Sequence, residues 1–364
     1  MANVSLYVHI PFCYSKCFYC GFFSIKYSQL IVDEYITALI KEMQHFQEQS
    51  IHSVYIGGGT PSILSIKQMQ RLLNAIGKFF NLNKLQEFTF EVNPDSISID
   101  KLKLLKSFCV NRLSIGLQSI NDKLLTYLGR TYNFQLFLKI YEAARKEAFN
   151  NINIDLIYGF PKHIMNDWIQ TLSTVLSLNS EHLSLYPMSI EMNTVFYKKH
   201  FNIDNKLQRK MYDIAVKMLN YNKYVHYEIS SWEKRNNKSI HNVSYWNNCE
   251  YIGIGAGACG YINHIRYKNI DNVPKYISLI KTNNINVKIE HEKINKATHI
   301  LESILLGLRL LENGVNIKFF KLYKQHYLAL KKCLNNKTLI NNAGKIKLNP
   351  KYIFVSNQIL KEFV

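Results

Sequence analysis

Hydrophobic and polar positions follow two alternating rhythms along the first 220 residues. Short apolar runs rich in β-branched and aromatic residues predict strands, and longer stretches with an apolar residue every three or four positions predict helices. The predicted strands are 6–10, 53–56, 88–92, 112–117, 153–158 and 182–186. The predicted helices are 32–47, 66–80, 99–105, 134–147, 167–178 and 205–220. Six β-α units in series imply an α/β protein with a parallel sheet.

The residues with the most distinctive chemistry come where these predicted strands end. Three cysteines follow the first strand, Gly57 begins a glycine triplet after the second, Glu91 lies late in the third, Gln118 follows the fourth, and Asp155 lies in the fifth. Sites built from several strand ends are typical of a barrel mouth, whereas an open sheet binds at one crevice. Six units instead of eight predict a partial (β/α)6 barrel that is open on one side.

Beyond residue 221 the pattern predicts a different organisation. Residues 222–280 are irregular and carry an H-N-x-x-Y-W motif and a glycine-rich segment, and residues 281–293 are polar and read as a linker. Helical patterns at 297–311 and 318–334 precede a hairpin pattern at 338–355. We therefore expect a core at 1–221, an irregular extension at 222–280, and a small helical, winged-helix-like domain at 293–364.

Composition excludes several classes of protein. With 47% hydrophobic and 20% charged residues in 364, the chain is neither disordered nor fibrous. No window approaches about 18 uninterrupted apolar residues, and the N-terminus lacks the pattern of a signal peptide. Seven cysteines are too sparse for a disulfide framework. These features predict a cytoplasmic protein.

The net charge is strongly positive, at +19, and much of it is local. Residues 318–364 hold ten lysines and a single acid, Glu362. A basic tail suits nucleic acid, acidic lipid or an acidic partner, but a solvated surface is the ordinary meaning of such a run. We expect no specific nucleic acid, and only peripheral contact with a membrane if any.

The strongest chemical signal is a C-x3-C-x2-C motif formed by Cys13, Cys17 and Cys20. A structural zinc site needs four ligands, and no fourth cysteine or histidine stands at a natural spacing, because His9 lies behind the loop in the strand. Three cysteines can hold a [4Fe-4S] cluster with one iron free to bind a small molecule. Structural zinc stays open as the alternative.

The residues around this motif resemble the radical S-adenosylmethionine (SAM) superfamily. The resemblance rests on 6–13 with the cysteine motif, on Gly57-Gly58-Gly59-Thr60-Pro61, and on further matching segments at 91–94, 113–119, 128–130, 153–159 and 241–246. It covers nearly the whole chain. More narrowly, the chain resembles the branch that contains oxygen-independent coproporphyrinogen III dehydrogenase and the HemW-type haem chaperones.

The resemblance implies a [4Fe-4S] cluster held by the three cysteines, with SAM chelated through its amino and carboxyl groups at the open iron. The positions that match SAM-binding positions of the family are Tyr7, Tyr19, Gly58, Gly59, Thr60, Glu91, Gln118, Arg130 and Asp155. Physical reasons fit some of them, because glycines let backbone approach a ligand and a carboxylate accepts ribose hydroxyls. Each also has a plain alternative, such as a helix-capping turn at Thr60 or core packing of the tyrosines.

One motif is set aside. Gly255-Ala256-Gly257-Ala258-Cys259-Gly260 satisfies G-x-G-x-x-G, but no clear helix and second strand follow it, and Asp271 comes too early to bind a ribose. Family members carry a similar glycine-rich stretch. We expect no dinucleotide there.

Departures from the family patterns decide between the branches. Phe22 stands where the dehydrogenase branch has a further cysteine, and the motif from His241 to Trp246 resembles the chaperone branch, where it implies haem binding. The alternative for His241 is a buried structural histidine. Cys259 replaces a histidine common in that branch, and a thiolate also ligates haem iron. Gly21 replaces an aspartate with no consequence that we can assign.

We therefore expect a haem chaperone-like radical SAM protein that binds a [4Fe-4S] cluster, SAM and haem, and passes haem to an acceptor protein such as a respiratory haem protein. No catalytic residue is assigned, and turnover of SAM is left open. The alternative is an oxygen-independent coproporphyrinogen III dehydrogenase that decarboxylates propionates. A remoter one is an RNA-modifying radical SAM enzyme, although no RNA-binding module is visible.

Overall fold

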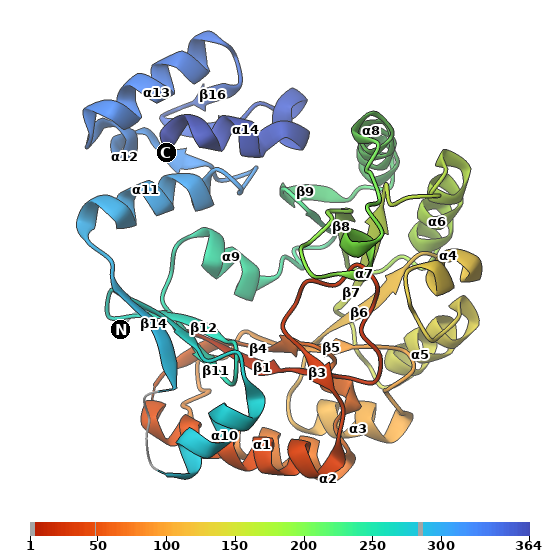
Figure 1. The fold of residues 1–364 in the computed structure, drawn as a ribbon. Helices are drawn as coiled ribbons and strands as arrows, with labels where there is room; N and C mark the ends of the chain where they lie inside the picture. The colour runs from red at the N-terminus through yellow and green to blue at the C-terminus, as the bar shows by residue number, and fades with distance from the viewer. Residues whose placement is uncertain (1–3, 48, 283–286) are drawn as a thin grey trace.

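The computed structural model describes residues 4–47, 49–282 and 287–364 (Figure 1). Six parallel strands lie side by side in chain order: β1 (Val4–Ile10), β4 (Ile51–Gly58), β5 (Glu87–Val92), β6 (Arg112–Gln118), β7 (Ile152–Tyr158) and β8 (His182–Pro187). Each is followed by a helix on the outside of the arc: α1 (Gln29–Met43), α2 (Ile66–Phe79), α3 (Ile99–Ser107), α5 (Phe134–Lys146), α6 (Met165–Ser177) and α8 (Asn205–Tyr221). The predicted partial (β/α)6 barrel is confirmed.

The six strands are two-faced. Their outward residues, such as Leu6 and Val8 of β1, join one apolar core with the helices. Their inward residues are polar and mostly buried, and neighbouring strands pair Ser5 with Ser53 and Asn153 with His182. The strand period of two therefore separates an apolar outer layer from a polar barrel interior.

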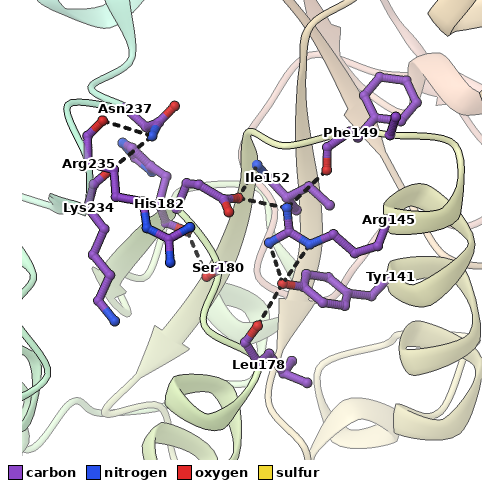
Figure 2. A network of polar contacts seen from close by, with 12 residues as sticks. Tyr141, Arg145, Phe149, Ile152, Leu178, Ser180, His182, Lys234, Arg235 and Asn237 are labelled. Atoms are coloured by element: carbon purple, nitrogen blue, oxygen red, sulfur yellow. Dashed lines mark hydrogen bonds and ion pairs between the residues drawn. The ribbon is translucent and has the colours of Figure 1, made fainter.

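A polar network fastens the closed end of the barrel, where the strands begin (Figure 2). Arg145 of α5 pairs with Glu181 at 2.8 Å and donates to the carbonyl of Phe149 at 2.9 Å, and it also reaches the Tyr141 hydroxyl, at 2.6 Å for the shorter contact. Glu181 accepts in addition from the backbone N–H of Ile152. The network holds α5 against the starts of β7 and β8.

The prediction that residues 222–280 are irregular is wrong, because this segment extends the sheet at both edges. Strands β9 (Val225–Glu228) and β10 (Ser231–Glu233) continue beyond β8, and β11 (Tyr251–Ile254), β12 (Cys259–Ile262) and β13 (Ile265–Asn269) continue beyond β1. Helices α9 (Ile240–Trp246) and α10 (Val273–Lys281) complete the segment. Strands of three to five residues are too short to show a period.

The predicted linker at 281–293 is also wrong where the structure describes it, and residues 283–286 lie outside the described residues. Lys288–Lys293 forms β14, which pairs with β13 in antiparallel register. Cross-strand ion pairs, Arg266 with Glu292 and Lys268 with Glu290, join the two strands. The polar composition that suggested a linker is typical of an edge strand, where charges discourage further pairing.

The C-terminal part combines helices with a small sheet. Its elements are α11 (Lys296–Gly307), β15 (Val315–Asn316), α12 (Ile317–Lys321), α13 (Lys324–Asn335), β16 (Leu339–Asn342), β17 (Lys345–Leu348), a 3-10 helix at Pro350–Val355, and α14 (Ser356–Leu360). The helix predicted at 318–334 is therefore two helices. The three strands, in order β15-β17-β16, match the helix-and-hairpin expectation. Figure 1 shows this part above α9, against which α11 packs.

No helix in the described part of the chain is long and apolar enough to cross a membrane.

Candidate cofactor site

The cysteine loop lies at the mouth of the barrel, between β1 and α1. Strand β2 (Phe12–Cys13) pairs with β3 (Ile25–Lys26), so the loop folds back on itself. Cys13 lies in β2, and Cys17 and Cys20 lie between the two strands. Phe18 anchors the loop by a backbone hydrogen bond to Leu128 at 3.0 Å. All three motif cysteines are partly exposed. The loop thus presents three thiols to the mouth.

The glycine triplet packs directly behind these thiols. Gly59 donates to the carbonyl of Ile10 at 2.9 Å, and a Cβ at Gly59 would lie 2.8 Å from the carbonyl oxygen of Phe12 and 3.1 Å from the Cys13 sulfur. The hydroxyl of Thr60 donates to the same sulfur at 3.5 Å. Only glycine fits this position beside the first thiol.

The donor set suits an iron–sulfur cluster. Thiolates are its usual ligands, and each cysteine binds a different iron, so the three sulfurs need not meet at one point. Among the described residues, no three His, Cys, Asp or Glu side chains are grouped to hold a single metal ion. Burial raises the pKa of Cys17 and of Cys20. Metal binding by these thiols would therefore release protons.

Glu91 lies near the end of β5, inside the mouth, and is held by two donors. The hydroxyl of Tyr55 donates to one carboxylate oxygen at 2.7 Å, and the backbone N–H of Gly58 donates to the other at 3.2 Å. A Cβ at Gly57 would lie 3.0 Å from the carboxylate. Burial raises the pKa of Glu91 to about 7. The carboxyl group is thus positioned and titrates near neutral pH.

Arg130 reaches the same mouth from the segment after α4 (Asp122–Tyr127). Its guanidinium donates to Asn93 at 3.1 Å and to the hydroxyl of Tyr19 at 2.5 Å, while its buried Nε has no partner among the described residues. Gln118 adopts a φ of +70° at a register shift between β6 and β7. A Cβ at Gly116 would lie within 4 Å of the side chains of Gln118, Asn93 and Arg130 alike. These three polar groups therefore converge.

A small cavity of about 20 Å³ joins this group to the cysteine loop, with Cys17, Thr60, Asn93 and Arg130 in its wall. Asp155 completes the mouth from β7, where it accepts hydrogen bonds from Ser114 and Asn153 at 2.9 and 2.8 Å. Burial raises its pKa. The structure thus brings the strand-end residues expected from the sequence to one mouth, beside the cysteines.

Tyr7 and Gly58 are linked through His9. The Tyr7 hydroxyl lies 2.8 Å from Nδ1 of His9, and a Cβ at Gly58 would lie 2.6 Å from the same ring. The φ of Gly58 is +117°, which favours glycine. The fold itself therefore requires glycine at position 58, in addition to the close approach of a ligand that the sequence predicts there.

The two candidate haem ligands lie in different surroundings. His241 is 1% exposed, its Nδ1 lies 3.1 Å from the Ser53 hydroxyl, and its Nε2 lies 2.9 Å from the Tyr245 hydroxyl. Burial lowers its pKa to about 3. These surroundings are those of a buried structural histidine, which the sequence analysis kept as the alternative to a haem ligand. Cys259 is exposed on β12, and partial burial of the thiol raises its pKa.

Sequence reasoning missed residues that hold the predicted ones. Tyr55, Ser114 and Asn153 orient Glu91 and Asp155, and the alternation of polar and apolar residues within each strand was the signal for them. It also did not predict that the side chains of Phe22 and Met192 are exposed, at 71% and 73%. Their segments touch, since a Cβ at Gly21 would lie 2.9 Å from Cβ of Glu191.

Comparison with known proteins identifies the family. The model of the radical SAM superfamily matches residues 7–175. The chain is 37% identical to "Heme chaperone HemW" of Lactococcus lactis over 99% of this chain and 97% of that protein. It is 34% identical to the HemW of Bacillus subtilis over 99% of each, and 33% identical to that of Escherichia coli over 71% of this chain and 70% of that protein.

The structure is similar to that of coproporphyrinogen III oxidase (HemN) from Escherichia coli, with a TM-score of 0.87 over 100% of this chain and 90% of that one. The identity is 21%, so this likeness shows the fold alone. The family is assigned by the 37% and 34% identity to the chaperones, which extends over nearly the full length of the chain. The chain belongs to the HemW family of the radical SAM superfamily, whose members carry a [4Fe-4S] cluster and SAM.

Proposed function

We propose that this protein is a haem chaperone of the cytoplasm, which binds a [4Fe-4S] cluster through Cys13, Cys17 and Cys20, binds SAM beside it, and passes haem to an acceptor protein. The observation that carries the proposal is its similarity to HemW proteins over nearly the whole chain. The mouth supports it, because the cysteine loop borders a small cavity lined by Arg130, whose buried Nε has no partner among the described residues.

The residues of the mouth have distinct roles in this proposal. The cluster, when bound, supplies an open iron for the amino and carboxyl groups of SAM and one electron. Arg130 offers its free Nε and its charge to the carboxylate end of that ligand. Glu91 accepts ribose hydroxyls, held ready by Tyr55 and by the backbone of Gly58. Thr60 supports the Cys13 sulfur.

Haem needs a ligand atom that can reach its iron. His241 would have to break a hydrogen bond to Ser53 or Tyr245 and leave the interior. Cys259 is exposed and needs only to lose its proton. We therefore take Cys259 as the first candidate ligand and His241 as the second. Because the thiolate is the ligand and burial raises the Cys259 pKa, haem affinity should rise with pH.

Haem titration of the anaerobically reconstituted protein tests the proposal. We expect about one haem per chain, a Soret band altered by Cys259→Ser, and transfer to an apo-cytochrome used as acceptor. Cys249→Ser is the matched control, since Cys249 is a partly buried cysteine just before β11. A band altered by His241→Asn alone would move the ligand role to His241. Formation of protoporphyrinogen IX from coproporphyrinogen III, with no stable haem complex, would replace the chaperone by the dehydrogenase.

A further inference from the structure

The helix that carries the H-N-x-x-Y-W motif, α9, is docked on the floor of the barrel. Glu87, the first residue of β5, accepts from the backbone N–H groups of Ile240 at 2.6 Å and His241 at 3.3 Å, and from the Ser239 hydroxyl at 3.3 Å. A carboxylate at the start of a helix is a stabilising arrangement. Figure 1 shows α9 between the sheet and the C-terminal helices. The motif is thus fixed to β5, the strand that carries Glu91 near its other end.

The His241 ring contacts the residue that positions Glu91. Its centroid lies 5.1 Å from that of Tyr55, with an angle of 33° between the ring planes. Hydrogen bonds to Ser53 and Tyr245 fix the imidazole on both sides. Tyr55 in turn donates its hydroxyl to Glu91 at 2.7 Å. A continuous line of contacts therefore runs from the motif to the carboxyl group in the mouth.

We propose that His241 is a positioning residue for the SAM pocket: it holds the Tyr55 ring at the angle that brings the Tyr55 hydroxyl onto Glu91. The inference rests on the proposed function in one respect, that Glu91 accepts hydrogen bonds from the ligand's ribose. It gives the motif a role that does not require an iron–histidine bond. Loss of His241 therefore lowers SAM affinity indirectly, by weakening the hydrogen bond from Tyr55 to the carboxyl group of Glu91.

The consequence is a change in the pH dependence of SAM binding. The charged or titratable groups that face Glu91 are Tyr7 on β1, Tyr55 on β4, Arg112 on β6, Asp155 on β7 and Tyr186 on β8. Burial raises the pKa of Glu91 to about 7, and the bond from Tyr55 acts in the opposite direction. Removing that bond therefore raises the pKa further. His241 itself, with a pKa of about 3, stays neutral over the range tested.

Equilibrium dialysis of SAM against the reconstituted protein, from about pH 6 to 8.5, is the test. Tyr55→Phe keeps the ring and removes the hydroxyl, so SAM affinity should fall about threefold at pH 6.5 and approach the wild-type value at pH 8.5. His241→Asn should move the midpoint in the same direction, by about half a pH unit.

His52→Asn is the matched control for a purely structural effect. His52 is buried, bonds the Ser244 hydroxyl of α9 and the Val4 carbonyl, and leaves the Tyr55 hydrogen bond in place. It should lower stability without moving the midpoint. A His241→Asn profile that matches the control, or a loss of affinity equal at every pH, would overturn the inference. Haem titration of the wild type tests the proposed function separately. If the wild type binds no haem, the chaperone function is wrong, whereas the pH dependence of SAM binding still tests the role of His241.

Discussion

Two partly buried arginines, one at each end of the barrel, are used in opposite ways. At the closed end, Arg145 spends its donors on Glu181, the Phe149 carbonyl and the Tyr141 hydroxyl (Figure 2). At the mouth, Arg130 has two neutral partners, an Nε without a partner, and no ion pair among the described residues. A buried charge is costly unless it is paired. The closed end therefore uses its arginine for stability, and the mouth keeps one for a ligand.

The carboxyl groups follow the same division. Glu181 accepts from Arg145 and from the Ile152 backbone, so its charge is balanced by a cation. Among the described residues, Glu91 accepts only from neutral donors, and burial raises its pKa to about 7. Among the described residues, the mouth thus holds Glu91 without a paired cation and Arg130 without a paired anion. This barrel therefore separates the groups that hold it together from those that are available to a ligand.

The largest expected effect comes from the three cysteines at the mouth. Changing Cys13, Cys17 or Cys20 to Ala should abolish the cluster absorbance near about 400 nm after anaerobic reconstitution, because each thiolate holds one iron. The control is Cys109→Ala, since Cys109 is exposed and precedes β6 at the closed end. A cluster of full intensity without Cys17, or zinc at full stoichiometry with no iron uptake, would contradict the assignment.

Exchanging each arginine for methionine should separate stability from binding. Arg145→Met leaves Glu181 buried without its cation, so unfolding by denaturant should cost about 3 kcal/mol less. Arg130→Met should lower SAM affinity about tenfold or more with a smaller change in stability, because no buried carboxylate loses its partner. Equal losses of stability in the two variants would break the comparison.

The sequence was enough for the barrel, and it placed several of its distinctive residues at the strand ends where the structure has them. The strands of the core are long, and glycines, cysteines and acids at their ends mark the mouth, so 6–10 and 153–158 were placed within two residues of β1 and β7. The extension failed because strands such as β10 are three residues long and are set by pairing with β8, a contact distant in sequence. The edge strand β14 failed because its charged residues look like a linker.

Side-chain partners were the second thing that the sequence did not contain. His241 reads as a ligand in a motif, and only the fold shows that Ser53 and Tyr245 occupy both of its nitrogens. Gly58 reads as a place for a ligand, and only the fold shows that the His9 ring lies where a Cβ would be. Contacts between residues far apart in the chain are fixed by topology, which periodicity does not report.

The smallest expected effect on binding, and the sharpest test of the contrast, is Glu91→Gln. Folding raises the pKa of the Glu91 carboxyl group from 4.5 to about 7. Its contribution to the stability of the folded protein is therefore fully present below pH 4.5 and is lost as the pH rises through about 7. Glutamine removes that cost, so the unliganded variant should be more stable than the wild type by about 2 kcal/mol at pH 8 and equal to it near pH 4.

SAM affinity of the same variant should fall severalfold, because an amide accepts fewer ribose hydrogen bonds than a carboxylate. Glu181→Gln is the matched change at the closed end, and it should lower stability because Arg145 then loses its counter-charge. Opposite signs in denaturant titrations at pH 8 would establish that the mouth gives up stability for binding. The same sign in both variants would mean that Glu91 is fastened like Glu181.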